Sequence, residues 1–285
     1  RLSDELQAGL TFSKTTDRAQ ALQGADFVIN TAQVGGHDWS EALRSMGERH
    51  GYYRGAHLHM FGQMIFFLEV ARDIERICPN AWLIQSANPV FEGCTLMTRE
   101  TKTQVLGLCH GHYGYRDIAR VLGLDLAHVT AQMSGFNHWI WMTDFRYRGE
   151  DAYPLIDEWI RTKAEAYWAQ DDRTFHDNQM SRAAIHQYQL FGLMPIGDTP
   201  RMVDCPRLVG GWYHVDLATK QRWFGRLGGF DSEIGWQQYL DRMAENVQKV
   251  ERTATDMDQP VSAVFPPEQS DEQIVPIINS LVHDV

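Results

Sequence analysis

The sequence of 285 residues lacks the features that would assign it to several large classes of protein. It has only four cysteines, which are widely separated and show no paired spacing. A chain of this length can bury a large core without disulfides, so we expect free thiols and a cytoplasmic location. No segment approaches the ~18 uninterrupted apolar residues of a membrane span, and the first residues form no basic and apolar signal. Secretion and membrane insertion are therefore not expected.

An excess of positive charge is also missing. The chain has 26 Lys and Arg against 37 Asp and Glu, which gives a formal net charge of −11. The average field of such a chain repels nucleic acids and anionic membranes, so neither is expected as a partner. The motifs H-E-x-x-H, C-x-x-C and G-x-S-x-G are absent too, which argues against the commonest zinc, thiol-redox and serine-hydrolase sites.

What the chain does contain is an alternation of helices and buried strands. A helix is predicted over 19–22 before a strand over 27–29, and a second helix over 65–77 before a strand over 81–85. Successive units of this kind predict a doubly wound parallel sheet with crossover helices. Ligands of such sheets bind beyond the carboxyl ends of the strands, which here are followed by the segments NTAQVGG and SANP.

The ends of the chain carry two further expectations. A dinucleotide-binding sheet usually opens with a G-x-G-x-x-G turn, and this chain contains no such motif. We therefore expect the first β-α-β portion of the fold to precede Arg1. The final segment VPIINSLVHDV reads as an apolar strand without a clear end, so we also expect truncation at the C-terminus.

The segment GLCHGHYG, residues 107–114, is the first candidate site. A strand predicted over 104–108 delivers Cys109 at its end, and a later strand-like stretch delivers Asn137 and His138. A thiolate and an imidazole can together hold a borderline divalent ion that keeps positions open for substrate. The alternative is a buried thiol and a structural histidine, and the residues by themselves favour that alternative.

Four motifs in their order along the chain resemble the family 4 glycoside hydrolases. They are ADFVINTAQVGG, SANP, GLCHGH and GFNHWIW. Members of that family are NAD-dependent, Mn²⁺-requiring glycosidases and do not use the usual pair of carboxylates. The resemblance implies that Cys109 and His138 bind the metal. It also implies an α/β fold, in which a Rossmann-like doubly wound parallel sheet is fused to a mixed α+β catalytic domain of the lactate and malate dehydrogenase C-terminal type.

On this basis we expect residues 1–106 to be the remainder of the NAD-binding domain and residues 107–285 to be the catalytic and metal-binding domain. The resemblance implies that NAD⁺ takes a hydride from C3 of the sugar and that Mn²⁺ polarises the resulting ketone. A tyrosine then removes the C2 proton, the glycosidic oxygen is eliminated, water adds and the hydride returns. His110 is the implied acid. Tyr213 is our choice for the base, with Tyr188 as the alternative.

The resemblance also indicates a substrate class. The Cys-His pair at Cys109 and its neighbour resembles the α-galacturonidases, as do the segments FGLMPIGDTPR and GWYHVDL. A sugar carboxylate needs a cation, so Arg201 is predicted to bind it with His112 as a helper, although a surface ion pair would also explain Arg201. The remaining predicted contacts are Asn88 and Asn137 to the sugar, and Asn30, Gln33 and Asn88 to the nicotinamide side of NAD.

Three other functions stay open. One is a family 4 α-galactosidase or α-glucuronidase, the second is a metal-free 2-hydroxy-acid dehydrogenase of related architecture, and the third is a sugar-binding protein without activity. Only the first uses Cys109 and His138 as metal ligands. We expect the protein to form a homodimer or a homotetramer.

Overall fold

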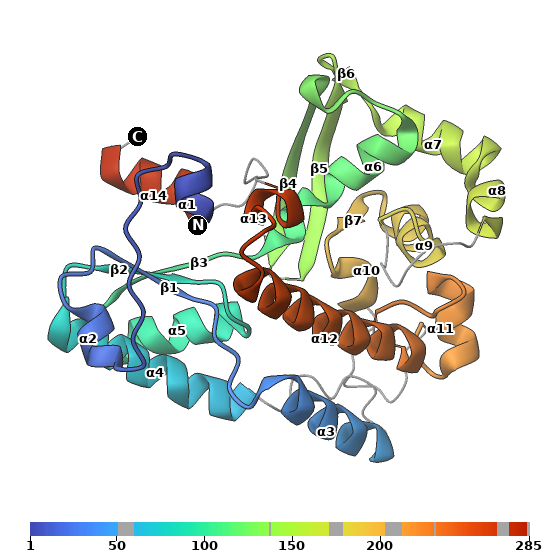
Figure 1. The fold of residues 1–285 in the computed structure, drawn as a ribbon. Coiled ribbons are helices and arrows are strands. Elements are labelled where there is room, and N and C mark those ends of the chain that lie inside the picture. Colours follow the sequence, from blue (N-terminus) through green and yellow to red (C-terminus); the bar gives the residue numbers. More distant parts are fainter. Residues whose placement is uncertain are drawn as a thin grey trace. The chain divides into compact units, whose positions relative to one another are not determined.

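The computed structural model describes residues 1–50, 60–136, 138–170, 179–202, 213–230, 232–266 and 274–283 (Figure 1). The chain folds into two compact units. The first unit comprises Arg1–Gly36, His59–Leu108 and Asp241–Val285, and the second comprises His37–Leu58 and Cys109–Leu240. The longer of the two segments that form the second unit therefore begins at Cys109.

A parallel sheet with the strand order β1-β2-β3 forms the centre of the first unit. The strands are β1 (Phe27–Asn30), β2 (Trp82–Gln85) and β3 (Gln104–Gly107). The register aligns Val28, Leu83 and Val105, so these side chains share one face of the sheet. Figure 1 shows this face covered by α2 (Arg18–Leu22), α4 (Met60–Ile77) and α5 (Val90–Glu100). The predicted parallel sheet with crossover helices is confirmed.

Helix α4 supplies four buried residues to the core beneath this sheet, more than any other element. Phe67, Val70, Ala71 and Ile74 are buried and recur every three or four residues, which places them on one stripe of the helix. They pack against Leu83 of β2 and fix the sheet on the helix. The strand ends that carry candidate ligands are positioned by this core.

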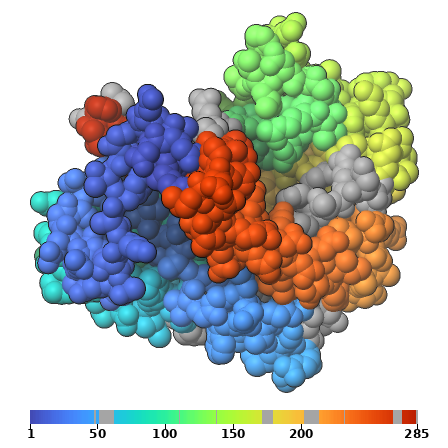
Figure 2. Space-filling model, viewed as in Figure 1, coloured from blue at the N-terminus to red at the C-terminus, as the bar shows by residue number. Residues whose placement is uncertain are grey.

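The two terminal segments of the first unit lie side by side. Arg1 donates to the carbonyl oxygens of Thr253 at 2.8 Å and of Gln259 at 2.7 Å. Glu5 of α1 (Leu2–Glu5) accepts from the backbone N–H groups of Val261 and Ser262 at the start of α13 (Val261–Val264). Figure 2 shows the blue N-terminal residues in contact with this orange-red segment.

The predicted C-terminal strand is wrong, because Ile274–His283 forms a helix, α14. Its apolar residues Ile274, Ile277, Ile278 and Leu281 are three or four positions apart, which is the helical period. A proline lies in its first turn, where no backbone N–H is needed. The composition of a short apolar run does not by itself distinguish a strand from a helix.

An antiparallel sheet forms the centre of the second unit. Its strands β4 (Val129–Phe136), β5 (Trp139–Tyr147) and β6 (Glu150–Asp151) are hydrogen-bonded in that order, and β7 (Met194–Ile196) pairs with β5. Helices accompany the sheet. They are α3 (Gly36–Arg49), α6 (Gly114–Leu122), α7 (Tyr153–Thr162), α8 (Ala164–Ala169), α9 (Arg182–Phe191), α10 (Thr199–Met202), α11 (Leu217–Phe224) and the first residues of α12 (Glu233–Thr255).

The core of this unit lies between the sheet and the helices α6, α7 and α9. Met142 and Phe145 of β5 pack with Ile118 of α6, Ile156 of α7 and Ile185 of α9. The mixed α+β architecture agrees with the predicted fold class. Among the helices in the described ranges, none has both the length and the apolar character to span a bilayer.

Candidate functional site

Cys109 lies at the carboxyl end of the parallel sheet, as its place in the sequence predicted. The backbone N–H of Leu108 donates to the carbonyl oxygen of Gln85 at 3.0 Å, which extends the β2–β3 pairing by one residue beyond Gly107. The chain is still extended at Cys109 and then forms a short 3-10 helix, η2 (His110–Tyr113), that leads into α6. The thiol is thus held between a strand and a helix.

His138 lies in the hairpin turn between β4 and β5, which closes with the pair Phe136 and Trp139. Its backbone has φ of 59°, in the left-handed region that residues other than glycine rarely adopt. This conformation costs about 1–2 kcal/mol for an L-residue. A left-handed conformation is common in tight hairpin turns, so the turn itself accounts for it.

The structure brings the side chains of Cys109 and His138 together. A hydrogen bond from His138 lowers the pKa of the Cys109 thiol, against the opposing effect of burial. The Asp198 carboxylate and, after it, Cys109 raise the pKa of His138 to about 9. A thiol with thiolate character beside an imidazole is a donor pair suited to a borderline divalent ion. Within the described ranges, no three Cys, His, Asp or Glu side chains form a larger group of this kind.

Asp198 is the residue of this site that sequence reasoning missed. Its Oδ2 lies 2.9 Å from Nδ1 of His138, and its Oδ1 forms an ion pair with Arg201. Burial opposes ionisation of this carboxyl, but the charge of Arg201 and the contact with His138 outweigh it and lower the pKa of Asp198. Because Nδ1 faces the carboxylate, Nε2 is the nitrogen of His138 available as a donor toward a metal.

The loop that carries Asp198 is held by several contacts. Strand β7 pairs Ile196 with Ile140 of β5, two residues after His138. The hydroxyl of Thr199 accepts from the N–H of Ile140 at 2.8 Å and donates to its carbonyl oxygen at 3.1 Å. Gln179 accepts from the N–H of Gly197 at 2.9 Å and donates to its carbonyl oxygen at 2.8 Å. Asp198 is therefore anchored from both sides.

The glycines of GLCHGHYG serve this same packing. Gly197 has φ of 64°, and a Cβ atom added there would lie 2.6 Å from Cα of Gly111. A Cβ on Gly114 would collide with the side-chain amide of Gln179. Only glycine allows these backbones to approach so closely, so the loop after Cys109 and the loop before Asp198 are in contact.

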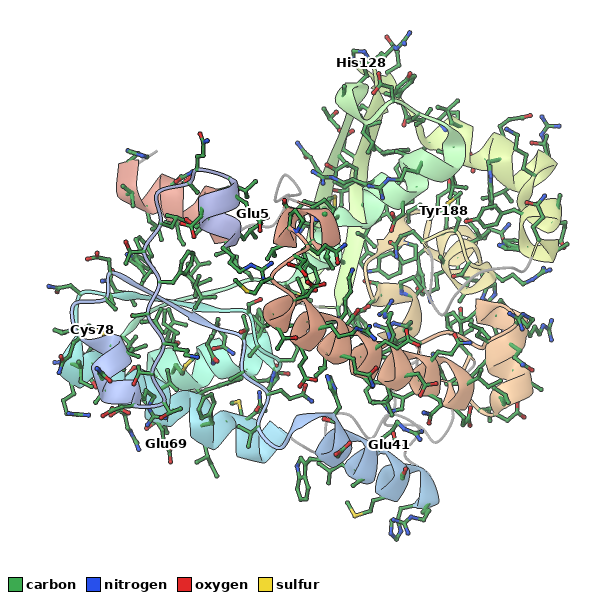
Figure 3. The ribbon with its side chains drawn as sticks, in the orientation of Figure 1. Glu5, Glu41, Glu69, Cys78, His128 and Tyr188 are labelled. Atoms are coloured by element: carbon green, nitrogen blue, oxygen red, sulfur yellow. The ribbon has the colours of Figure 1, made fainter. Side chains whose placement is uncertain are left out.

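Tyr213 and Tyr188, the two candidate bases, lie in different surroundings. Tyr213 is 1 % exposed and belongs to an aromatic cluster with Trp223, and its hydroxyl lies 2.8 Å from Nδ1 of His186. Tyr188 of α9, labelled in Figure 3, donates to Asp157 at 2.8 Å. Burial and this carboxylate raise the pKa of Tyr188. A phenol kept neutral in this way is a poor base, whereas Tyr213 has a partner that can accept its proton.

The residues predicted to contact NAD belong to the first unit. Asn30, at the end of β1, donates to the side chain of Gln85 at 2.8 Å. Gln63 of α4 donates to the carbonyl oxygens of Ala32 at 3.0 Å and Asn88 at 2.9 Å, so it ties together the loops that follow β1 and β2. Sequence reasoning missed Gln63, because a glutamine inside a helix has no distinctive motif. The amide of Gln33 lies 3.4 Å from the carbonyl oxygen of Gly36.

Of the remaining predicted site residues, the structure describes the side chains of Arg201 and His112. Arg201 is engaged by Asp198 and lies over the ring of Phe230, with 5.2 Å from Cζ to the ring centroid. His112 lies in η2 with its ring 4.0 Å from that of Tyr113. The backbone of His110 is in the same helix, but its side chain lies outside the described part of the structure, as does Asn137.

Comparison with known proteins gives a consistent result. Residues 1–124 match the model of family 4 glycosyl hydrolases, and residues 133–285 match the model of the family 4 glycosyl hydrolase C-terminal domain. An alpha-galactosidase of Bacillus subtilis is 28 % identical over 172 residues, which cover 57 % of this chain and 40 % of that protein. An alpha-galacturonidase of Thermoanaerobacterium saccharolyticum is 24 % identical over 226 residues, covering 72 % and 48 %. The chain thus spans half or less of the length of these relatives.

Solved structures show the same fold. A 6-phospho-alpha-glucosidase from gut microorganisms in complex with NAD and glucose-6-phosphate has a TM-score of 0.68 at 17 % identity, covering 95 % of this chain and 60 % of that chain. Another, in complex with NAD and Mn²⁺, has a TM-score of 0.58 at 22 % identity, covering 72 % and 50 %. At these identities the likeness concerns the fold alone.

Proposed function

The chain belongs to the family 4 glycosyl hydrolases, and from this premise we propose that it carries the metal and substrate site of an NAD- and Mn²⁺-dependent α-galacturonidase. The observation that carries the proposal is the contact of Cys109 with His138, supported by Asp198 on the far side of the imidazole ring. A carboxylate that orients a ligating histidine is a frequent companion of protein metal sites. Family membership favours this function over the metal-free dehydrogenase.

Cys109 and His138 would hold the ion, and their chemistry fits it. The thiol has a lowered pKa and Asp198 engages Nδ1 of the imidazole, so sulfur and, once its proton is released, Nε2 can bind the ion. When bound, a divalent ion would polarise a sugar oxygen as a Lewis acid. The complex of a similar structure with NAD and Mn²⁺ supports the choice of this metal.

Tyr213 is our proposed base, with His110 as the proposed acid. The Tyr213 hydroxyl can donate to Nδ1 of His186 at 2.8 Å, which gives the phenolic proton an acceptor when the tyrosine oxygen takes a proton from the sugar. Tyr188 lacks this relation, since Asp157 holds its proton.

We propose that residues 1–106 bind NAD and that residues 107–285 carry the reaction. Asn30, Gln33 and Asn88 follow the carboxyl ends of β1 and β2, where a doubly wound sheet binds its cofactor. Gln63 would act with them by holding the two loops in register.

The substrate is proposed to be an α-galacturonide, with Arg201 and His112 near its carboxylate and Asn88 and Asn137 near its hydroxyls. Arg201 offers the planar set of donors that matches a carboxylate in geometry. Relatives described as an alpha-galacturonidase and an alpha-galactosidase support a galacto-configured substrate. An α-galactosidase or α-glucuronidase is the alternative within the family. A homodimer or homotetramer stays a prediction.

The decisive experiment compares hydrolysis of an aryl α-galacturonide and an aryl α-galactoside by the protein with NAD⁺, Mn²⁺ and a reductant. We expect preferential cleavage of the galacturonide and loss of activity when NAD⁺ or Mn²⁺ is left out. In D₂O the released sugar should carry deuterium at C2, because the proton there is removed and replaced. Hydrolysis without NAD⁺, or without deuterium at C2, would contradict the proposed reaction, and preference for the galactoside would contradict only the proposed substrate.

A further inference from the structure

A cavity of about 340 Å³ lies in the second unit, among residues of α7, α8, α9 and α11. At about 30 Å³ per water molecule, this volume accommodates a ligand of roughly a dozen non-hydrogen atoms, the size of one sugar ring with its substituents. None of the metal, NAD or substrate residues proposed above lines it, although His186, the proposed partner of Tyr213, does.

The charges in this cavity do not balance. Arg182 and Arg222 both line it, together with the single carboxylate of Glu165. Arg182 pairs with Glu165, since two of its guanidinium nitrogens lie 3.2 Å from the carboxylate oxygens. Within the described ranges, Arg222 has no carboxylate partner. Among the described lining residues there is therefore one more positive than negative side chain, in a chain whose net charge is −11.

Both guanidinium groups are held over indole rings. The Cζ atom of Arg182 lies 4.4 Å from the ring centroid of Trp168, and that of Arg222 lies 5.5 Å from the ring centroid of Trp223. The indole N–H of Trp168 donates to the carbonyl oxygen of Met180 at 2.8 Å, which fixes the ring. A guanidinium stacked on an aromatic face can still donate from its N–H edge to a carboxylate, as Arg182 does to Glu165, and it loses little side-chain entropy on binding.

The remaining wall suits a polyhydroxylated ring. Ile160 and Ile185 provide apolar contact, while Gln189 can both donate and accept. His186 also lines the cavity, and its Nδ1 is engaged by Tyr213, so its second ring nitrogen is the one that can serve a ligand. Mixed apolar and hydrogen-bonding walls with a cation at one end match a sugar that carries one acid group.

We propose that this cavity is a binding site for a sugar acid, a monoanionic hexuronate whose carboxylate is held by Arg222 and Arg182. A carboxylate matches the single excess positive charge of the described lining, whereas a phosphate monoester carries close to two negative charges at neutral pH. The site is separate from the Cys109 and His138 pair. It does not depend on the proposed reaction, because binding here needs neither metal nor NAD⁺.

The experiment is titration calorimetry of the protein with D-galacturonate, in the presence of a chelator and without NAD⁺, so that the proposed metal site does not contribute. We expect saturable binding of one ligand per chain. Arg222→Gln should weaken the binding about 10- to 100-fold, the effect of losing a charge-assisted hydrogen bond. Arg148→Gln is the matched control, because Arg148 also stacks on an aromatic ring, that of Tyr147, but does not line the cavity.

A second variant gives a change of the opposite sign. Glu165→Gln removes the carboxylate that competes for Arg182, so it should tighten galacturonate binding about 2- to 5-fold. A variant that merely damages the fold would not bind more tightly. Circular dichroism should show unchanged melting for all three variants, since Arg148, Glu165 and Arg222 are exposed on the surface.

Ligand comparison decides the chemistry. D-galactose has the same ring without the carboxylate and should bind far more weakly than galacturonate. Equal affinity for galactose, tighter binding of galactose 6-phosphate, no binding in the chelator buffer, or equal losses in Arg222→Gln and Arg148→Gln would each overturn the proposal. All four outcomes leave the proposed hydrolase function untouched, because they are measured without metal, cofactor or turnover.

Discussion

Asp198→Asn tests whether the carboxylate behind His138 tunes the proposed metal site. The substitution keeps the size of the side chain and an oxygen that can accept from Nδ1, so His138 should keep its tautomer and orientation. What is lost is the negative charge 2.9 Å from the imidazole. The ion pair that Asp198 forms with Arg201 is lost as well, which leaves a positive charge near the proposed metal site.

Both losses weaken the binding of a cation. A hydrogen bond to a charged group contributes about 1.5–3 kcal/mol, which corresponds to roughly a 10- to 150-fold change in an equilibrium constant. Substitutions behind a metal-ligating histidine commonly reduce affinity 10- to 100-fold. We therefore expect Asp198→Asn to weaken Mn²⁺ binding by about 10- to 100-fold, without changing which atoms bind the ion.

The assay is competition for Mn²⁺ between the protein and a chromogenic chelator, with the folded fraction determined by circular dichroism. Asp144→Asn is the control, because Asp144 pairs with Arg146 at 2.9 Å on β5 but does not contact His138. It should bind Mn²⁺ as the parent does. If Asp198→Asn bound Mn²⁺ as tightly as the parent, Asp198 would not support the metal site and the pairing with His138 would be structural only.

Four further outcomes are expected. Cys109→Ser should lose Mn²⁺ binding and activity. The oxidised parent protein, by contrast, should regain both when Mn²⁺ and a reductant are added. Metal retained by Cys109→Ser after gel filtration would exclude Cys109 as a ligand. Arg201→Ala should lower kcat/KM for galacturonides about 30- to 150-fold and kcat/KM for galactosides far less. Equal losses for the two substrates would mean that Arg201 acts through its ion pair with Asp198 instead. Gly197→Ala should lower the free energy of unfolding by more than about 2 kcal/mol in urea titrations, because it adds a backbone clash to the left-handed strain of about 1–2 kcal/mol. Gly192→Ala is the control, since Gly192 has the same left-handed backbone but lies in open space. Equal losses in the two variants would show that the contact with Gly111 is unimportant. Hydrogen bonds from Arg44, together with Ser45 and Trp236, lower the pKa of Glu41 despite burial. The stabilisation by the Glu41 carboxylate should therefore be present above its unfolded pKa of about 4.3 and disappear as pH falls through its lower folded pKa. The difference in Tm between the parent and Glu41→Gln should accordingly shrink between pH 7 and about pH 3; a difference independent of pH would contradict this.

Local patterns in the sequence determined the framework of the first unit. The helix before β1, the buried strand β2 and the position of Cys109 directly after β3 follow from apolar periodicity and from the residues that end helices, which act over a few residues. Pattern failed at the C-terminus, where a short apolar run was predicted as a strand and is the helix α14. There the spacing of the isoleucines indicated a helix better than their composition indicated a strand.

The pairing of Cys109 with His138 came from the order of motifs that the family shares, since spacing alone favoured a structural role for both. Tertiary structure decided the rest of the site. Asp198 meets His138 only because β7 pairs with β5 and because glycines at 111 and 197 let two loops touch. The cavity between Arg182 and Arg222 likewise forms only when α9 and α11 pack together. Such contacts join residues far apart in the chain, and their energy depends on side-chain packing rather than on any local signal.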